Sequence, residues 1–595
     1  MRNFRLCLLT AFLVASLLDS TTFAETRVVV ESTGGKHRLL RNGKPYFIRG
    51  AGGDASLGKL VARGGNSIRT WGTEKLDTLL DEAQKNGLTV TVGFWLGHER
   101  HGFDYSDSKA VARQYEECIR AVRKYRSHPA VLMWGIGNEM EGSGKNTKIW
   151  KAIEDIAKEC KRIDPNHPTM TVIAEIGGSK IESIETHCPS IDVIGVNSYG
   201  GSGSLGKRYA AAKGNKPFVI TEFGPLGPWE CGRTPWGSPI EESSTEKAKR
   251  YAEAYRSSIK AFPDLCLGSY AFLWGHKQES TATWFGMLLP DGSHLAPVDV
   301  LTAEWTGKAP KNRCPEISAL NLDTKNLKPG GTLRATVTAS DPDGDKLRYE
   351  WMLRADSGKR STGGDFQRNE REFAKAVKSR GREVTVNLPE ASRSYRLFIY
   401  VYDGHGGAAV ANEAFRAASP KKLVAPKKAK LPFTLYGDGA KSSPFIPSGF
   451  MGNAKAVKLE TERKNPRSGK TCLRAEYRAS DAWGGVIWQS PAGDWEGDKP
   501  GGLDLSGATA LEFWVRGAAG GEVVNFVFGV LDGQQKYRDT AKGELKSVKL
   551  TTKWRKLRIP LKGKDLSRIK TGFGWAAPGQ GKNLTFFLDD IRYVR

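Results

Sequence analysis

The chain has 595 residues, a formal net charge of +25 and eight cysteines. This length exceeds what one hydrophobic core supports, so a single small domain is excluded and two to four domains are expected. The basic residues are spread along the chain without a nucleic-acid-binding motif, which favours a basic surface over a nucleic-acid-binding protein. Acidic glycans remain a partner class that this charge would suit.

The first 24 residues predict a secretory signal peptide. Arg2 and Arg5 precede an apolar run at residues 6–18, and residues 22–24 form a cleavage site. The apolar run is too short to span a bilayer with these flanks, although a retained anchor is the alternative. We therefore expect cleavage after Ala24, a secreted or periplasmic protein and no membrane span. The seven cysteines that remain show neither the spacing of metal ligands nor the density of a disulfide-rich domain. One or two disulfides are compatible with the sequence.

From residue 25 to about residue 313, short apolar runs alternate with amphipathic stretches. The apolar runs predict eight strands, at residues 45–51, 66–71, 88–95, 130–137, 169–176, 191–196, 217–221 and 266–274. Between them, apolar residues recur at three- and four-residue steps, which predicts helices at 75–85, 110–125, 148–163 and 246–262. This alternation favours an α/β fold, a (β/α)8 TIM barrel. A doubly wound open sheet is the alternative, but no Gly-rich phosphate turn follows the first strand.

Beyond residue 313 the helical pattern stops. Residues 314–418 contain alternating strands around Pro/Asp/Gly turns, which predicts a small Ig/PKD-like β-sandwich. A basic Pro/Ala linker at 419–430 leads to residues 431–595, which are again all β and rich in Trp and Gly. This last segment predicts a jelly-roll sandwich, so two all-β domains are expected to follow the barrel.

Two carboxylates follow predicted barrel strands at the same end. Glu139 comes after the fourth strand in WGIGNEM, and Glu222 ends the seventh strand in ITEFG. Active sites of such barrels lie at the C-terminal ends of the strands, so both side chains are expected at one barrel mouth. Glycoside hydrolysis needs such a pair: one carboxylic acid protonates the leaving oxygen, and one carboxylate attacks or activates water.

WGIGNE and ITEFG resemble the two signatures of clan A glycoside hydrolases. Over about residues 37–308 the barrel most resembles that of glycoside hydrolase family 2, and more distantly the fungal β-1,3-glucanosyltransferases. The resemblance implies that Glu139 is the acid/base, Glu222 the nucleophile, and Asn138 a hydrogen-bond partner of the sugar 2-hydroxyl. Family 2 enzymes normally carry sandwich domains before the barrel, whereas here they follow it, so the substrate and the exo mode of cleavage do not carry over.

Five further residues match positions of the same glycoside hydrolase barrel. The resemblance implies that Arg69 in SIRTW keeps the nucleophile ionised, and that Tyr199 in IGVNSYG hydrogen-bonds it, with Asn197 just before. Trp274, at the end of the eighth predicted strand, matches the aromatic floor under the sugar, and Trp95 is expected in the cleft as well.

The C-terminal sandwich resembles jelly-roll carbohydrate-binding modules through its last strand, FFLDDI at residues 586–591. The resemblance implies a structural calcium ion held by Asp589 or Asp590, with a solvated acidic pair as the alternative. Four tryptophans are candidate sugar platforms or core residues: Trp483, Trp488, Trp495 and Trp575. The chemistry of the barrel itself needs no cofactor.

The sequence therefore predicts a secreted, monomeric, retaining β-glycosidase that hydrolyses a β-linked poly- or oligosaccharide and binds no nucleic acid. One alternative is a β-glucan transglycosylase that uses the same two glutamates. Another is a non-catalytic glycan-binding protein on a degenerate barrel, against which the intact pair of Glu139 and Glu222 argues.

Overall fold

The computed structural model describes residues 26–325, 327–356, 367–418, 423–438, 443–479, 482–533 and 535–595. The expected signal peptide and residues 419–422 of the expected linker lie outside this part of the chain. Within the described residues, no helix combines the length and the apolar character that a membrane span requires. The seven described cysteines are all free, so no disulfide forms among them.

Eight parallel strands close a barrel in the order β10-β11-β4-β5-β6-β7-β8-β9. They are β4 (Ile48–Gly52), β5 (Ser67–Arg69), β6 (Thr89–Phe94), β7 (Val131–Asn138), β8 (Thr169–Ala174), β9 (Val193–Asn197), β10 (Phe218–Phe223) and β11 (Cys266–Ala271). Nearly every strand residue is buried, because one face fills the barrel and the other packs against helices. The predicted eight-stranded barrel is confirmed.

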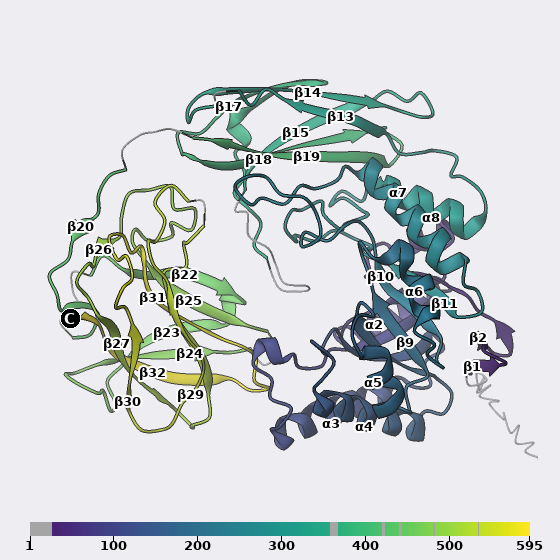
Figure 1. Cartoon of the computed structure of the whole chain (residues 1–595), viewed down its shortest axis with the longest axis horizontal. Coiled ribbons are helices and arrows are strands. Elements are labelled where there is room, and N and C mark those ends of the chain that lie inside the picture. The colour runs from purple at the N-terminus through teal and green to yellow at the C-terminus, as the bar shows by residue number, and fades with distance from the viewer. Residues whose placement is uncertain are drawn as a thin grey trace, which may run out of the picture.

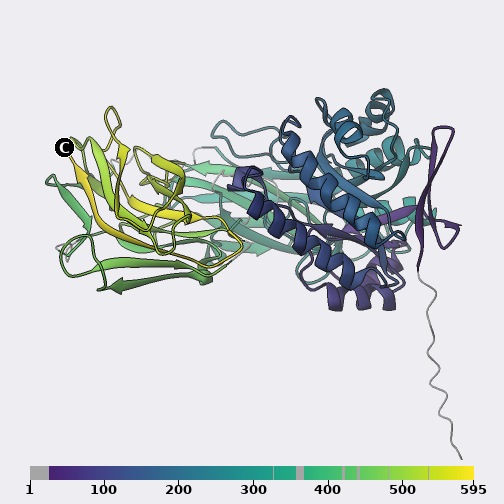
Figure 2. The same ribbon diagram turned by 90° about the horizontal axis from the view of Figure 1, so that it is seen from below.

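Helices follow the barrel strands and cover the outside of the barrel (Figures 1 and 2). They are α1 (Leu57–Ala62), α2 (Leu76–Lys85), α3 (Ser108–Tyr125), α4 (Thr147–Ile163), α5 (Lys180–His187), α6 (Leu205–Ala211), α7 (Ser244–Ala254) and α8 (Ala296–Thr306). In α4, the buried residues Ile149, Ile153, Ile156 and Cys160 recur at three- and four-residue steps, so one face of the helix packs on the barrel.

A small antiparallel sheet closes the end of the barrel opposite the mouth. It consists of β1 (Val28–Thr33), β2 (Lys36–Arg41) and β3 (Lys44–Pro45). Val28 and Leu39 of this sheet join a buried cluster with Ile48 and Val193, the first residues of two barrel strands. The C-terminal ends of the barrel strands, where the candidate site lies, are thus left for the longer loops.

The second unit contains two four-stranded sheets around one core. Their orders are β12-β19-β18-β15 and β13-β14-β17-β16. The strands are β12 (His294–Leu295), β13 (Glu316–Leu322), β14 (Thr332–Ser340), β15 (Arg348–Ala355), β16 (Val377–Arg380), β17 (Glu383–Asn387), β18 (Arg393–Tyr402) and β19 (Gly407–Ala417). In β14 every second residue is buried, as expected for a strand with one face in a core. Strand β12 precedes α8 and yet pairs with β19, so the barrel segment supplies a strand to this unit.

The C-terminal unit contains a six-stranded and a five-stranded sheet around a third core, and a short two-stranded sheet links β20 to β26. Its strands are β20 (Lys427–Lys428), β21 (Phe433–Tyr436), β22 (Ile446–Gly452), β23 (Val457–Glu462), β24 (Cys472–Tyr477), β25 (Gly484–Gln489), β26 (Leu503–Asp504), β27 (Ala510–Gly517), β28 (Val523–Phe528), β29 (Gly543–Lys549), β30 (Arg555–Pro560), β31 (Thr571–Ala577) and β32 (Leu584–Val594). In Figure 1 the second unit spans the top, between the barrel and the C-terminal unit. Arg393 of the second unit donates to Glu496 and Asp498 of the C-terminal unit, over 2.7 and 3.2 Å.

Candidate active site

Glu139 and Glu222 both lie at the C-terminal ends of barrel strands. Glu222 is the fifth residue of β10, and Glu139 follows the last residue of β7 directly. Glu139 has a left-handed backbone with φ +52°, a conformation that costs a non-glycine residue free energy and is often kept at functional sites. Its Oε1 accepts a hydrogen bond of 2.7 Å from Nδ2 of Asn197, the last residue of β9. Residues at the C-terminal ends of β7, β9 and β10 thus converge on one mouth.

Three donors hold the Glu222 carboxylate, two from the end of β5 and one from the loop that follows β9. Arg69, at the end of β5, donates to Oε1 over 2.9 Å, and the Trp71 indole donates to the same oxygen over 2.7 Å. The Tyr199 hydroxyl donates to Oε2 over 2.6 Å. Both oxygens therefore have fixed positions, among positive and partially positive groups. Trp71 was not predicted from the sequence, although it follows Arg69 by two positions; it lies beyond the end of β5 and meets the same carboxylate oxygen as Arg69.

Asn138 and Asn197 belong to the same network. Oδ1 of Asn138 accepts from Arg69 over 2.6 Å and from Asn197 over 3.1 Å. Oδ1 of Asn197 accepts from the Thr221 hydroxyl over 2.8 Å, which fixes the amide of Asn197 with its Nδ2 toward Glu139. Both contacts of Asn138 use Oδ1, so its Nδ2 lies on the opposite side of the amide. The structure brings together Arg69, Asn138, Asn197, Tyr199 and both glutamates.

The two glutamates differ in their surroundings. Burial, followed by repulsion from Glu222, raises the pKa of Glu139 from its ordinary 4.5 to about 7, although the hydrogen bond from Asn197 opposes this. Burial and the charge of Glu222 also raise the pKa of Tyr199 well above its ordinary value, so this residue remains a hydrogen-bond donor. One carboxyl group thus keeps a proton near neutral pH while the other faces a cation and two neutral donors.

The predicted aromatic floor is corrected by the structure. Strand β11 ends at Ala271, and Trp274 lies in the core of the barrel with 1% of its surface exposed, so it offers no ring face to a sugar. Phe272 lies instead beside the site: its ring centroid is 5.6 Å from that of Trp71 and 6.0 Å from that of Tyr199. Phe272 could not be placed from the sequence, because the apolar run continues to residue 274 while the strand ends at Ala271.

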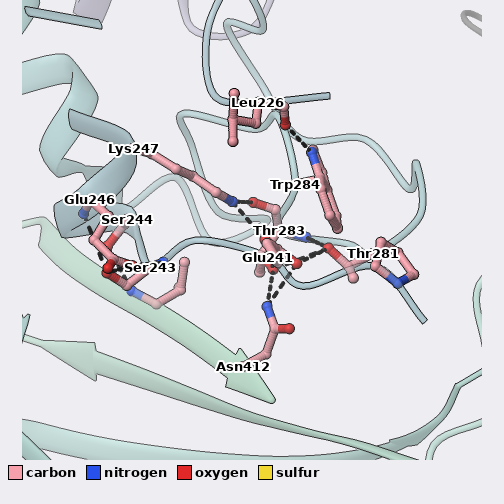
Figure 3. A network of polar contacts seen from close by, with 12 residues as sticks. Leu226, Glu241, Ser243, Ser244, Glu246, Lys247, Thr281, Thr283, Trp284 and Asn412 are labelled. Atoms are coloured by element: carbon pink, nitrogen blue, oxygen red, sulfur yellow. Dashed lines mark hydrogen bonds and ion pairs between the residues drawn. The ribbon is translucent and has the colours of Figure 1, made fainter. Parts of the chain in front are cut away.

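A buried polar network supports the loops beside these rings (Figure 3). Glu241 accepts hydrogen bonds from Lys247 of α7 over 2.6 Å, from the Thr281 and Thr283 hydroxyls over 2.5 and 2.8 Å, and from Asn412 of β19 over 2.7 Å. Burial raises the pKa of Glu241, but Lys247 and these hydrogen bonds outweigh it, and the net pKa lies below its ordinary value. The second unit is thereby bonded to the loops that follow β10 and β11.

The expected calcium ligands do not fit a cation. Oδ2 of Asp589 accepts from the backbone N–H groups of Arg467 and Ser468, over 2.9 and 3.2 Å, and its Oδ1 accepts from that of Asp590. Asp590 accepts from the Ser468 hydroxyl over 2.7 Å. Both oxygens of Asp589 thus face donors, the opposite of what a metal ion needs. Of the four candidate platforms, Trp488 and Trp575 are buried in the core, whereas Trp483 and Trp495 are partly exposed.

Comparison with protein families gives two matches. Residues 78–226 match the TIM barrel domain of glycosyl hydrolases family 2, a segment that includes Glu139 and Glu222. Residues 443–595 match carbohydrate binding domain 30. Both resemblances inferred from the sequence, of the barrel and of the C-terminal unit, are confirmed.

Curated relatives match over part of the chain. β-Glucuronidase from Rattus norvegicus is 27% identical over 191 residues, which cover 28% of this chain and 26% of that protein. Mannan endo-1,4-beta-mannosidase F from Aspergillus clavatus is 26% identical over 127 residues, which cover 18% of this chain and 29% of that protein. The chain thus spans between a quarter and a third of the length of these relatives.

Among solved structures, a β-D-glucuronidase for Dictyoglomus thermophilum aligns with a TM-score of 0.38 and 18% identity, over 48% of this chain and 54% of the other. A β-glucuronidase of Ruminococcus gnavus aligns with the same TM-score and identity, over 48% of this chain and 53% of the other.

Proposed function

Because residues 78–226 match the TIM barrel domain of glycosyl hydrolases family 2, we propose that this chain is a retaining β-glycosidase. The observation that carries the proposal is the contrast within the pair of carboxylates. Glu139 keeps its proton up to about pH 7, while Glu222 is held by Arg69, Trp71 and Tyr199. Two carboxyl groups with opposite environments are what acid-assisted nucleophilic displacement at a sugar requires.

In the proposed reaction, an oxygen of Glu222 attacks the anomeric carbon while Glu139 gives its proton to the leaving glycosidic oxygen. The bond between the sugar and the leaving group breaks, and a covalent glycosyl-enzyme forms. Asn138 is proposed to bond the sugar 2-hydroxyl through Nδ2, since its Oδ1 is already engaged by Arg69 and Asn197. Phe272, which is 6% exposed beside Trp71 and Tyr199, is proposed as the ring nearest the sugar in place of Trp274.

The second half of the reaction follows from the electrostatics of the pair. Once Glu222 has become an ester it carries no charge, so the repulsion that helps to raise the pKa of Glu139 disappears. Glu139 then accepts a proton from water more readily, and the water attacks the anomeric carbon and releases the sugar with its β configuration. The same residue thereby acts first as acid and then as base.

The proposed substrate is a β-linked poly- or oligosaccharide. The names of the relatives, β-glucuronidases and mannan endo-1,4-beta-mannosidases, both denote hydrolysis of β-linked sugars. The match of residues 443–595 to a carbohydrate binding domain supports a polymer, because a tethered binding domain raises the local concentration of polymer at the barrel.

A substrate screen tests the proposal. Wild-type protein and Glu222→Ala are incubated with β-glucans, galactans, mannans and 4-nitrophenyl β-glycosides, and the products are analysed by mass spectrometry and NMR. Release by the wild type alone, with the β anomer formed first, would support the retaining hydrolase. Products longer than the substrate would instead indicate the transglycosylase, and binding without turnover the non-catalytic alternative.

The remaining parts of the proposal concern the whole chain. We propose a monomer that is exported and cleaved after Ala24, with a barrel at 25–313, an Ig/PKD-like sandwich at 314–418, a linker at 419–430 and a jelly-roll unit at 431–595. N-terminal sequencing of the protein recovered outside the cytoplasm tests the cleavage, and light scattering tests the oligomeric state.

A further inference from the structure

Two exposed tryptophans follow barrel strands that lie opposite each other. Trp95 comes directly after β6 and Trp229 follows β10, and 40% and 43% of their surfaces are exposed. In the closed order of eight strands, β6 and β10 are separated by three strands in either direction. Since both residues follow the C-terminal ends of their strands, they lie on opposite sides of the mouth that holds Glu139 and Glu222.

The Trp229 ring is fixed in position beside the nucleophile. Its centroid is 5.5 Å from that of Tyr199, whose hydroxyl bonds Glu222. The carboxylate of Glu230 accepts from the backbone N–H groups of Gly200 and Gly227, over 3.0 and 2.8 Å, which ties the loop of Trp229 to the loop of Tyr199. A Cβ atom on Gly227 would lie 2.4 Å from the Trp229 ring, so the ring folds back over this glycine.

The Trp95 ring is equally well supported. It stacks on the His98 ring with centroids 4.8 Å apart and an interplanar angle of 27°. The loop after Trp95 is anchored at Gly97. The N–H of Gly97 donates to Gln114 of α3 over 2.6 Å, and its carbonyl accepts from the Tyr105 hydroxyl over 2.7 Å. An exposed indole that is held this firmly has already lost its conformational entropy, which lowers the cost of binding a ligand on its face.

From this arrangement we infer that the substrate is a chain that crosses the barrel mouth from Trp95 to Trp229 and is cut in its interior. The inference rests on the proposed function and adds the mode of cleavage to it. Eight strands roughly 4.8 Å apart and tilted by about 36° enclose a ring roughly 15 Å across, which is wider than one sugar ring. A ligand that touches both indoles therefore extends beyond the bond being broken on both sides.

A row of rings that passes the nucleophile and ends at Trp229 agrees with a long ligand. Trp71, Phe272, Tyr199 and Trp229 follow one another with centroid separations of 5.6, 6.0 and 5.5 Å. Apolar faces of sugars pack on aromatic rings, and the exposed indole at the end of the row extends this surface past the nucleophile. An enzyme that removes single sugars from a chain end would gain nothing from platforms on both sides of the pair.

The test compares Trp95→Ala and Trp229→Ala with the wild type on cello-, laminari- and manno-oligosaccharides of two to six units. Phe47→Ala is the matched control, because Phe47 is 39% exposed but precedes β4 at the opposite end of the barrel. For each tryptophan variant, the ratio of kcat/KM for the hexamer to that for the dimer is expected to fall at least about tenfold. The control and the variants Trp95→Tyr and Trp229→Tyr should keep most of this ratio.

Products of the intact polymer provide the second measurement. Interior cleavage by the wild type should lower the viscosity of the polymer before reducing sugar accumulates. Release of single sugars only, or an unchanged hexamer-to-dimer ratio of kcat/KM in both alanine variants, overturns the inference. Neither result contradicts the proposed glycosidase activity. If the wild type hydrolyses nothing, the proposed function fails. Calorimetric binding of the same oligosaccharides to Glu222→Gln then tests whether a chain crosses the barrel mouth. Affinity that rises with chain length and is lost in the Trp95 and Trp229 variants supports the crossing chain, and absence of binding overturns it.

Discussion

At the scale of single residues, the proton on Glu139 is the feature on which the chemistry depends. Asn197 orients its carboxyl group, and burial together with Glu222 raises its pKa to about 7. The nucleophile needs no such proton, and its partners are a guanidinium, an indole and a phenol. Substitutions at the two positions should therefore fail in different ways, which separates their roles.

Replacing Glu139 with Gln should affect substrates according to their leaving groups. Gln cannot donate a proton to the leaving oxygen, and general acid catalysis contributes about 10²–10⁴-fold. Turnover of 4-nitrophenyl glycosides and of glycans should fall by that range, whereas 2,4-dinitrophenyl glycosides, which leave without a proton, should still form the glycosyl-enzyme. Burst kinetics at 400 nm measure this, and equal losses on both substrates would contradict the role of Glu139 as acid.

The pH dependence of stability provides an independent test of the same residue. Because the folded protein raises the pKa of Glu139 from 4.5 to about 7, the stabilisation that its proton supplies is complete below about pH 4.5 and is lost as the pH rises through 7. Glu139→Gln should thus be more stable than the wild type at pH 8, by roughly 1–3 kcal/mol, and no more stable at pH 4. Urea unfolding at both pH values measures the difference, and activity of the wild type should decline above pH 7.

At the scale of strands and loops, the sequence predicted those elements whose positions follow from the periodicity of apolar residues. The eight strands, and the placement of Glu139 and Glu222 after the fourth and on the seventh, follow from apolar runs and spacing. Trp274 was misplaced because the apolar run continues to residue 274 although β11 ends at Ala271. Trp229 and Glu241 lie in a loop without periodicity, where contacts distant in sequence decide the conformation, and no pattern could predict them. Asn412, for example, is 171 positions from Glu241.

Glu241 should be important for the stability of these loops. Glu241→Gln leaves the ammonium of Lys247 buried without its carboxylate, which typically costs about 3–5 kcal/mol. The control is Asp155→Asn, whose partner Lys151 is exposed and whose ion pair is worth less than about 1 kcal/mol. Since the folded protein lowers the pKa of Glu241, the loss should be largest above pH 5 and shrink as acid protonates the wild-type residue. Equal, small losses in the two variants would show that the network carries little stability.

At the scale of the whole molecule, the barrel and the second unit share structure. Strand β12 pairs in parallel with β19, Asn412 bonds Glu241, and Arg396 donates to the carbonyl of Pro239 over 2.8 Å. The contacts of Arg393 with Glu496 and Asp498 join the second and C-terminal units through side chains that water could solvate if they separated. The boundary between the barrel and the second unit therefore crosses a sheet and a buried hydrogen-bond network. At the boundary between the second and the C-terminal units, the described residues form the ion pairs of Arg393.

This difference predicts how fragments behave. A fragment of residues 25–418 keeps β12, β19 and the Glu241 network, and it should unfold in one transition and turn over aryl glycosides as the full chain does. A fragment of residues 25–313 leaves β12 without its neighbouring strand and removes Asn412 from Glu241, so it should lose several kcal/mol and aggregate or melt at lower temperature. Differential scanning calorimetry and aryl glycosidase assays on both fragments measure this. A barrel fragment with the thermal stability of the longer one would show that the second unit is dispensable, and that the loops behind Phe272 and Trp229 hold themselves in place.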